Sequence, residues 1–298
     1  MRTAAARATR ERTYILRESS LRSPATAMAK ILARGRVSRN SLLPMFPLPR
    51  IGPGKDFPPL RVGPRDRVFV LTGAGISAES GVRTFRDAGG LWEQHRIEDV
   101  ATPEGFARDP RMVWRFYSER RRQVGSVHPN PAHLALAKLQ QQIGERLFLC
   151  TQNVDPLHER AGSRDVHHMH GELLKSRCES CDRPPFPDPQ GYEDDPRCDL
   201  CGERLRPHVV WFGEVPFGMD RIFEELEECD LFVTVGSSGA VHPAAGFVSH
   251  LRHNPNSRGG FARCVYVGVE RPENTHSFDE CRLGKAGELL PDLFQLPR

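Results

Sequence analysis

Two Cys-x-x-Cys pairs constrain this chain more than any other feature. Cys178 and Cys181 form the first pair, and Cys198 and Cys201 form the second. Two thiolates at this spacing grip one face of a tetrahedral ion, and a second pair completes its shell. We therefore predict one structural zinc ion, with no open coordination position for substrate or water. Catalysis must then come from other residues, and His170, just before the first pair, is our candidate, with His167 and His168 as its rivals.

The composition limits the class of protein. At 298 residues the chain can bury a sizeable core in one large domain or two smaller ones. No apolar run approaches the ~20 residues that cross a bilayer, so we expect no membrane association. The cysteines outside the two pairs are scattered, which fits a reducing compartment better than a disulfide framework: Cys150, Cys229, Cys264 and Cys281.

Charge divides the chain into two parts. Residues 1–60 carry 12 Lys and Arg against 3 acidic residues, whereas the remainder carries 30 against 35. The acidic body disfavours a nucleic-acid partner. Prolines crowd the end of the basic part, so we predict a disordered leader over 1–60 and a catalytic domain over 61–298. We expect a cytoplasmic protein; the alternative is a mitochondrial one, with the Arg-rich leader as its transit peptide.

Short apolar runs alternate with a helical pattern. The residues Ala132, Leu136, Leu139 and Ile143 recur on one face and predict a helix over 131–143. Four runs predict buried parallel strands: 67–72, 147–151, 231–235 and 264–269. This alternation indicates an α/β fold with a doubly wound, parallel, Rossmann-like sheet.

Two segments interrupt the alternation and predict a small second lobe. One is a helical insert over about 88–128, and the other is the zinc module over about 171–206. The Rossmann-like lobe would then comprise about 61–87, 129–170 and 207–298. We expect ligands to bind in the cleft between the lobes.

A glycine turn follows the first predicted strand. Gly73-Ala74-Gly75-Ile-Ser-Ala78 fits the pattern G-x-G-x-x-G/A, in which glycines allow a tight turn and a close approach to a pyrophosphate. A plain strand–turn–helix explains the same residues about equally well, and the pattern also occurs in dehydrogenases.

Polar residues follow two other predicted strands at their carboxyl ends, where open α/β sheets bind ligands. Neutral amides beside one carboxylate suit the hydroxyls of a ribose and the amide of nicotinamide. Asx turns or helix caps would account for the same residues. The two groups are Gln152, Asn153 and Asp155, and Gly236, Ser237 and Ser238.

Taken together, these blocks resemble the sirtuins, the class III NAD-dependent protein deacylases. The resemblance runs in order from about Arg67 to the C-terminus and is closest to the bacterial sirtuin deacetylase/desuccinylases. It rests on the two cysteine pairs and on residues 73–81, 84–86, 151–155, 170–171, 206–214 and 236–238.

The resemblance implies removal of acyl groups from protein lysines, with release of nicotinamide and O-acyl-ADP-ribose. His170 would be the general base, and Val210 and Phe212 would clamp the substrate as an extended strand. NAD, the co-substrate, would be held by Gly73, Ala74, Gly75, Phe85, Arg86, Gln152, Asn153, Asp155, Gly236, Ser237, Ser238 and Ala286.

The resemblance also bears on the acyl group. Tyr117 and Arg120 are three residues apart, so they share a helix face. A guanidinium and a phenol there would bind the carboxylate of a succinyl or malonyl group, and the small Ala101 would leave the tunnel wide. The alternative is that Arg120 has no binding role and is one of three solvated arginines.

One position departs from the family pattern, because Gly268 stands where sirtuins usually carry an asparagine that binds the adenosine ribose. Three other functions remain open from the residues. They are a non-catalytic NAD or ADP-ribose sensor, a mono-ADP-ribosyltransferase and a zinc-ribbon protein that binds nucleic acid.

Overall fold

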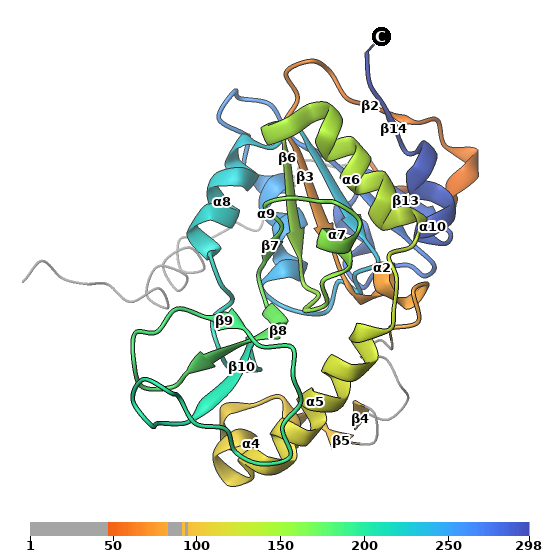
Figure 1. Ribbon diagram of the computed structural model, residues 1–298. Helices are drawn as coiled ribbons and strands as arrows, with labels where there is room; N and C mark the ends of the chain where they lie inside the picture. Colours follow the sequence, from red (N-terminus) through yellow and green to blue (C-terminus); the bar gives the residue numbers. More distant parts are fainter. Residues whose placement is uncertain (1–46, 83–90, 93–94, 298) are drawn as a thin grey trace, which may run out of the picture. The chain divides into compact units, whose positions relative to one another are not determined.

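The computed structural model describes residues 47–82, 91–92 and 95–297, and Figure 1 shows their arrangement. Residues 47–298 form one compact unit. The body therefore begins earlier than the residue 61 that we expected. In the segment before residue 61, Arg50–Pro53 form a strand at a sheet edge and Gly54–Asp56 form a 3-10 turn.

A seven-stranded sheet forms the centre of this unit. Its order is β1-β13-β12-β11-β3-β6-β7, and neighbouring strands are parallel throughout. The chain winds outwards from β3 in both directions, which confirms the doubly wound sheet. The strands are β1 (Arg50–Pro53), β3 (Val68–Thr72), β6 (Leu147–Thr151), β7 (His167–His168), β11 (Leu231–Val235), β12 (Arg263–Gly268) and β13 (Glu280–Leu283).

Helices cover both faces of the sheet (Figure 1). On one face, α6 (Pro131–Ile143), α10 (Ala286–Leu289) and the 3-10 turn η4 (Leu290–Asp292) contribute to a core with the valines and leucines of β3 and β6. On the other, α8 (Met219–Glu228) and α9 (Ala244–His253) pack against aromatic residues of the strands. The helix predicted over 131–143 is confirmed. It begins because the Asn130 side chain caps it and Pro131 presets its first turn.

A smaller lobe packs around its own aromatic core, which includes Trp114, Phe116, Tyr117 and Trp211. The helical part comprises α3 (Ile97–Val100), α4 (Pro103–Arg108) and α5 (Pro110–Gly125), with a hairpin of β4 (Leu91–Trp92) and β5 (His95–Arg96). An antiparallel sheet of order β10-β8-β9 lies against α5. Its strands are β8 (Gly171–Cys178), β9 (Phe186–Pro187) and β10 (Leu205–Val209).

Short elements complete the unit. The strand β2 (Leu60–Arg61) pairs with β14 (Phe294–Gln295), so the two ends of the unit lie side by side. The others are η1 (Gly54–Asp56), α2 (Ala74–Ala78), η2 (Gly144–Arg146), α7 (Leu157–Arg160) and η3 (Thr275–Ser277). Within the described residues, no helix is long and apolar enough to cross a membrane.

Candidate active site

The glycine turn after β3 packs directly on the turn after β11. A Cβ on Gly75 would lie 2.8 Å from the Gly236 Cα, and a Cβ on Gly73 would lie 2.8 Å from the Ser237 Cα. The Gly75 amide donates to the Gly236 carbonyl at 2.9 Å. Glycine is therefore required here by contact between two backbones. This requirement stands whether or not a pyrophosphate also approaches the turn.

The polar residues after β6 lie at the same edge. The Asn153 side chain donates to the Gly73 carbonyl and to the Ser77 hydroxyl, both at 3.1 Å. The Gln152 side chain donates to the Ser237 hydroxyl at 2.9 Å. Three strand ends thus converge on one cluster of amides and hydroxyls. Such a neutral set suits the hydroxyls and amide of a dinucleotide better than a free anion.

Asp155 completes this cluster and is buried. Its carboxylate accepts a hydrogen bond from the Leu157 amide at 3.1 Å, which is the Asx turn that the sequence left open as an alternative. Burial raises its pKa above the ordinary value, although the Leu157 amide and the Ser77 hydroxyl oppose the rise.

His170 stands between β7 and β8, at the junction of the two lobes. Its Nδ1 lies 3.0 Å from the Gln152 carbonyl oxygen, which can only accept, so Nδ1 carries the proton. Burial lowers the pKa of His170, so the ring is neutral and its Nε2 is a proton acceptor near neutral pH. The next residue, Gly171, has φ +83°, and a Cβ there would lie 2.2 Å from the His208 carbonyl oxygen.

A hollow of about 50 Å³, with room for a few water molecules, opens beside this cluster. Arg120 of α5 lines it together with Asp155, Leu173 and Val154, and Val82, Gln123 and Val124 complete the wall. The Arg120 residue is only 6 % exposed, and its guanidinium lies over the Phe116 ring at 4.8 Å. Arg120 is therefore not solvated, whereas Arg122, two residues further along α5, is exposed.

The other residues expected at the acyl end are buried but do not line this hollow. Tyr117 is 2 % exposed, and its hydroxyl accepts a hydrogen bond from the Trp211 indole at 2.9 Å. The Ala101 carbonyl accepts from the Phe212 amide at 2.9 Å, and the His170 carbonyl accepts from the Val210 amide at 2.9 Å. Phe85 and Arg86 lie outside the described residues.

Sequence reasoning missed the bidentate ion pair that shapes the segment from 209 to 214. Arg206 donates to both carboxylate oxygens of Glu214, at 2.7 and 2.9 Å, and its guanidinium lies 3.5 Å from the centre of the Trp211 ring. Burial alone would raise the pKa of Glu214, but the Arg206 hydrogen bonds outweigh it and lower the pKa. No spacing rule in the sequence indicated this pair.

A second missed residue is Arg121, whose side chain is fully buried. It donates to the carbonyls of Leu173 and Lys175 on β8 at 2.9 and 3.0 Å, and to the Ser176 hydroxyl at 3.0 Å. It also bonds Asp188 at 3.3 Å. Its helical spacing from Trp114 and Tyr117 was the signal that could have placed it on the inner face of α5.

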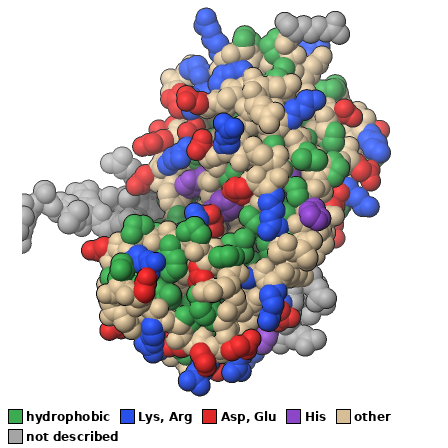
Figure 2. Space-filling view, in the orientation of Figure 1, with side chains coloured by type: hydrophobic (Ala, Val, Ile, Leu, Met, Phe, Trp, Pro, Cys, Tyr) green, Lys and Arg blue, Asp and Glu red, His purple; other side chains and the backbone are tan. Residues whose placement is uncertain are grey.

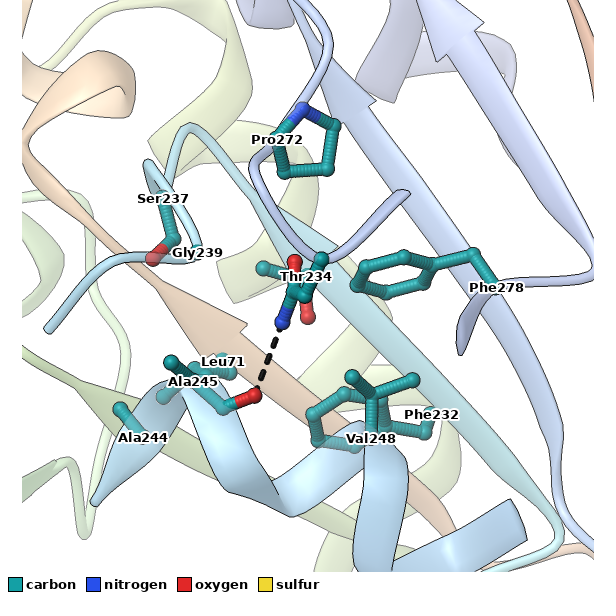
Figure 3. A pocket seen from close by; sticks show the side chains of 11 residues that line it. Leu71, Phe232, Thr234, Ser237, Gly239, Ala244, Ala245, Val248, Pro272 and Phe278 are labelled. Atoms are coloured by element: carbon teal, nitrogen blue, oxygen red, sulfur yellow. Dashed lines mark hydrogen bonds between the residues drawn. The ribbon is translucent and has the colours of Figure 1, made fainter. Parts of the chain in front are cut away.

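The turn after β11 closes a small cavity, shown in Figure 3. Leu71, Phe232 and Phe278 are among its largely apolar lining, and Ser237 stands at its edge. The Asn274 amide donates to the Ala245 carbonyl at 2.8 Å across it, the dashed line in Figure 3. The cavity has room for little more than one water molecule, so it is no cofactor site.

Two further expected residues lie near this edge. Ala286 begins α10 and is 4 % exposed. Gly268 ends β12, and a Cβ there would lie 2.3 Å from the Tyr266 hydroxyl oxygen. The tyrosine thus fills the space that a side chain at position 268 would need.

The four cysteines converge as predicted. Their sulfur atoms all lie within 4.8 Å of one another, and the Cys178–Cys201 and Cys181–Cys198 sulfur pairs are 3.5 and 3.8 Å apart. Four sulfurs around one zinc ion stand about 3.8 Å apart. The Ser180 and Cys181 amides donate to the Cys178 sulfur, as in a metal knuckle. The residues therefore fit a structural zinc ion.

Known proteins that are similar to this chain belong to the family that its sequence motifs indicate. The Sir2 family profile matches residues 73–243. An NAD-dependent protein deacylase of Shewanella oneidensis is 54% identical over 230 residues, which cover 76% of this chain and 92% of that protein. The NAD-dependent protein deacylase of Escherichia coli K12 is 51% identical over 234 residues, covering 78% of this chain and 82% of that protein.

Solved structures agree. A Sir2 homologue determined as a complex with NAD has a TM-score of 0.69 and 41% identity, and the match covers 77% of this chain and 89% of that one. A Sir2 protein bound to acetylated peptide has a TM-score of 0.62 and 27% identity, covering 75% and 90%.

The fold and the site together define a nucleotide-binding α/β protein with an inserted zinc module. More particularly, the chain belongs to the Sir2 family, as the sequence motifs predicted.

Proposed function

We propose that this protein is an NAD-dependent protein-lysine deacylase that removes succinyl and malonyl-type groups as well as acetyl. Its products would be the free lysine, nicotinamide and O-acyl-ADP-ribose. The curated relatives at 51–54% identity are named NAD-dependent protein deacylases, which supports the reaction class. The buried Arg120 in the wall of the hollow beside Asp155 carries the acyl preference.

Arg120 suits an acidic acyl group for physical reasons. A guanidinium in a buried wall gains more from a carboxylate than a solvated one does, because water competes less. Val82, Val154 and Leu173 in the same wall suit the methylene chain of the acyl group. A shorter acetyl group would leave space beside Arg120 that water can occupy, so acetyl-lysine remains a substrate.

The residues at the sheet edge have separate roles in this proposal. Gln152, Asn153 and Asp155 would orient NAD, together with the turns at Gly73 and Gly236. Bound NAD would supply a ribosyl carbon that bonds to the acyl carbonyl oxygen of the substrate as its bond to nicotinamide breaks. The Nε2 of His170 would then take the proton from a ribose hydroxyl, and Nδ1 would stay protonated against the Gln152 carbonyl.

A substrate peptide would lie as an extended strand beside Val210 and Phe212. Phe212 is 47 % exposed, although it is large and apolar. Hydrophobic side chains gather over the small lobe in Figure 2, and histidines lie near its junction with the sheet. Backbone pairing would give affinity for peptides of many sequences. The acyl pocket, and not the peptide sequence, would therefore decide the choice of substrate.

One incubation separates this function from its alternatives. The protein, NAD and matched succinyl-, acetyl- and unmodified lysine peptides are analysed by mass spectrometry. Loss of the acyl mass together with O-acyl-ADP-ribose supports the proposal. A peptide that gains ADP-ribose indicates a mono-ADP-ribosyltransferase, and binding without turnover indicates a sensor.

We also propose that the protein acts in the cytoplasm on protein substrates, and that nucleic acid is not a partner. The acidic composition of residues 61–298 supports the second statement. Fractionation that found the protein in an organelle, with its basic N-terminal segment removed, would favour the mitochondrial alternative.

A further inference from the structure

Two histidines, two residues apart, are held against consecutive carbonyls of the same loop. The Nδ1 of His170 lies 3.0 Å from the Gln152 oxygen, and the Nδ1 of His168 lies 3.0 Å from the Asn153 oxygen. A carbonyl oxygen only accepts hydrogen bonds, so both rings carry a proton on Nδ1. The loop after β6 is thus fixed by two N–H donors, one from His168 at the end of β7 and one from His170 just after it.

The two rings differ in what faces their other nitrogen. The Nε2 of His168 lies 2.8 Å from a carboxylate oxygen of Glu159 on α7. A carboxylate also only accepts, so both nitrogens of His168 face acceptors and both need a proton. The His168 side chain is 7 % exposed, so water replaces neither partner easily.

We propose that His168 is a positioning residue that acts as an imidazolium, joining the Asn153 carbonyl to Glu159 and so holding the NAD-binding loop in shape. This inference rests on the proposed function, because it gives the loop at 152–155 its role in binding NAD. It assigns opposite protonation states to two neighbouring histidines: a neutral base at 170 and a charged clamp at 168.

The surroundings favour this charge. Glu159 on α7 and Glu172 on β8 both act to raise the pKa of His168, and Asp155 in the loop itself adds a third carboxyl. Two further histidines, His158 and His167, face it with pKa values that burial lowers, so both are neutral. Burial opposes the charge on His168, but Glu159 outweighs it, and the net shift in pKa is upwards.

The sign of the pH effect follows from this shift. A histidine with a raised folded pKa holds its clamp fully below its unfolded pKa of about 6.5 and loses it as the pH rises through the folded value. NAD affinity should therefore fall on the alkaline side. His170 must be neutral to act, so the acid limb of the rate profile belongs to it, and the two limbs give a bell-shaped profile.

The first test observes the protonation states directly in the full-length protein. Two-bond 1H–15N correlation spectra of the histidine rings report which nitrogens carry protons. We expect His168 to titrate with a midpoint above pH 6.5, and His170 to show a bare Nε2 at neutral pH. A His168 ring that is neutral at pH 6.5 would overturn the proposal.

The second test measures the Kd for NAD by calorimetry between pH 6.5 and 9. In the unaltered protein the Kd should rise on the order of tenfold, the size of one charge-assisted hydrogen bond. His168→Asn keeps a donor for the Asn153 carbonyl but cannot titrate, so its Kd should be flat across this range. Glu159→Gln removes the charge that favours the imidazolium, so the rise should begin at a lower pH.

Glu145→Gln serves as the matched control, because Glu145 is also exposed but lies on η2, away from the loop. It should reproduce the unaltered curve. Unchanged pH curves in both His168→Asn and Glu159→Gln would refute the clamp, and Glu159→Gln alone decides if His168→Asn does not fold. A protein that shows these curves but no deacylation would refute the proposed function and leave this inference standing.

Discussion

At the scale of single residues, His170 is placed for proton transfer by a contact on the far side of its ring. The Gln152 carbonyl occupies Nδ1, so Nε2 is the basic nitrogen. Burial lowers its pKa, which keeps the ring neutral and available at physiological pH. A variant without the imidazole therefore loses the basic Nε2 and also the Nδ1 hydrogen bond to the Gln152 carbonyl.

We predict that His170→Ala lowers kcat by roughly 100-fold or more, the usual contribution of a general base. The free energy of unfolding should change little, because the His170 ring is only partly buried. Steady-state kinetics with succinyl- and acetyl-lysine peptides, beside a urea unfolding curve, measure both quantities. A variant with normal turnover on both peptides would remove His170 from the mechanism.

Arg120 is the residue whose replacement should affect succinyl-lysine and acetyl-lysine substrates differently. Arg120→Met should lose roughly 2–4 kcal/mol of transition-state binding for succinyl-lysine, because it removes a charged hydrogen bond from a buried wall. The loss for acetyl-lysine should be much smaller. The ratio of kcat/KM values for the two peptides measures this difference.

Arg122→Met is the matched control for that ratio, since Arg122 is close by on α5 but exposed. It should leave both kcat/KM values nearly unchanged. Equal losses on both peptides in Arg120→Met would mean that Arg120 does not bind the acyl carboxylate.

Local sequence patterns were enough to predict some of the site residues. They could not predict residues whose contacts lie far away in the chain. The cysteine spacing and the polar residues after strands predicted the zinc cluster and the converging edge. Helical spacing could place Arg121 on the inner face of α5, but its partners on β8 lie about fifty residues further along the chain and have no local signal. The pairing of His168 with Glu159 likewise depends on how α7 packs.

At the scale of elements, Arg121 joins α5 to the strand that leads to the zinc module. Its guanidinium contacts β8 at Leu173 and Lys175, and β8 ends at the zinc ligand Cys178. Leu173 and the neighbouring Arg120 both line the hollow. Arg121 is therefore one of the side chains of α5 that tie the acyl pocket to the zinc module, beside Trp114 and Ser118.

We predict that Arg121→Met lowers the free energy of unfolding by about 3–5 kcal/mol, because Asp188 would keep a buried charge without its partner. Urea unfolding measures this loss. Arg122→Met should change stability by no more than about 0.5 kcal/mol, as exposed substitutions usually do. Similar curves for the two variants would show that the Arg121 hydrogen bonds add little.

The zinc module should depend on its ion. Structural zinc contributes on the order of 10 kcal/mol to the folding of small zinc modules. Cys198→Ala should therefore lose the metal, unfold the small lobe and abolish turnover, as measured by zinc content and near-ultraviolet circular dichroism. Cys281→Ala removes a buried cysteine outside the cluster and should retain one zinc per chain. An active, zinc-free Cys198→Ala protein would contradict this prediction.

At the scale of the whole molecule, buried strands were the part of the fold that local sequence predicted well. Continuous apolar runs gave β3, β6, β11 and β12, because parallel strands in the middle of a sheet are covered on both faces. The edge strands β1 and β7 have no such run, and neither does β13 inside the sheet, where Glu280 and Arg282 form an ion pair. The place of the two edge strands depends on pairing with β13 and β6, which no local pattern reveals.

The N-terminal segment of the folded unit, residues 47–60, offers a test of how much an edge strand without a local signal adds to stability. The segment before residue 61 is rich in prolines, yet β1 pairs with β13 and Leu60 is fully buried in the main core. We predict that a protein lacking residues 1–46 keeps the stability and the turnover of the full chain. A protein lacking residues 1–60 should be less stable by several kcal/mol, of which burial of Leu60 alone accounts for about 1.5–3 kcal/mol. Urea unfolding of both truncated proteins measures the difference, and equal stability would mean that β1 and Leu60 add nothing to the fold.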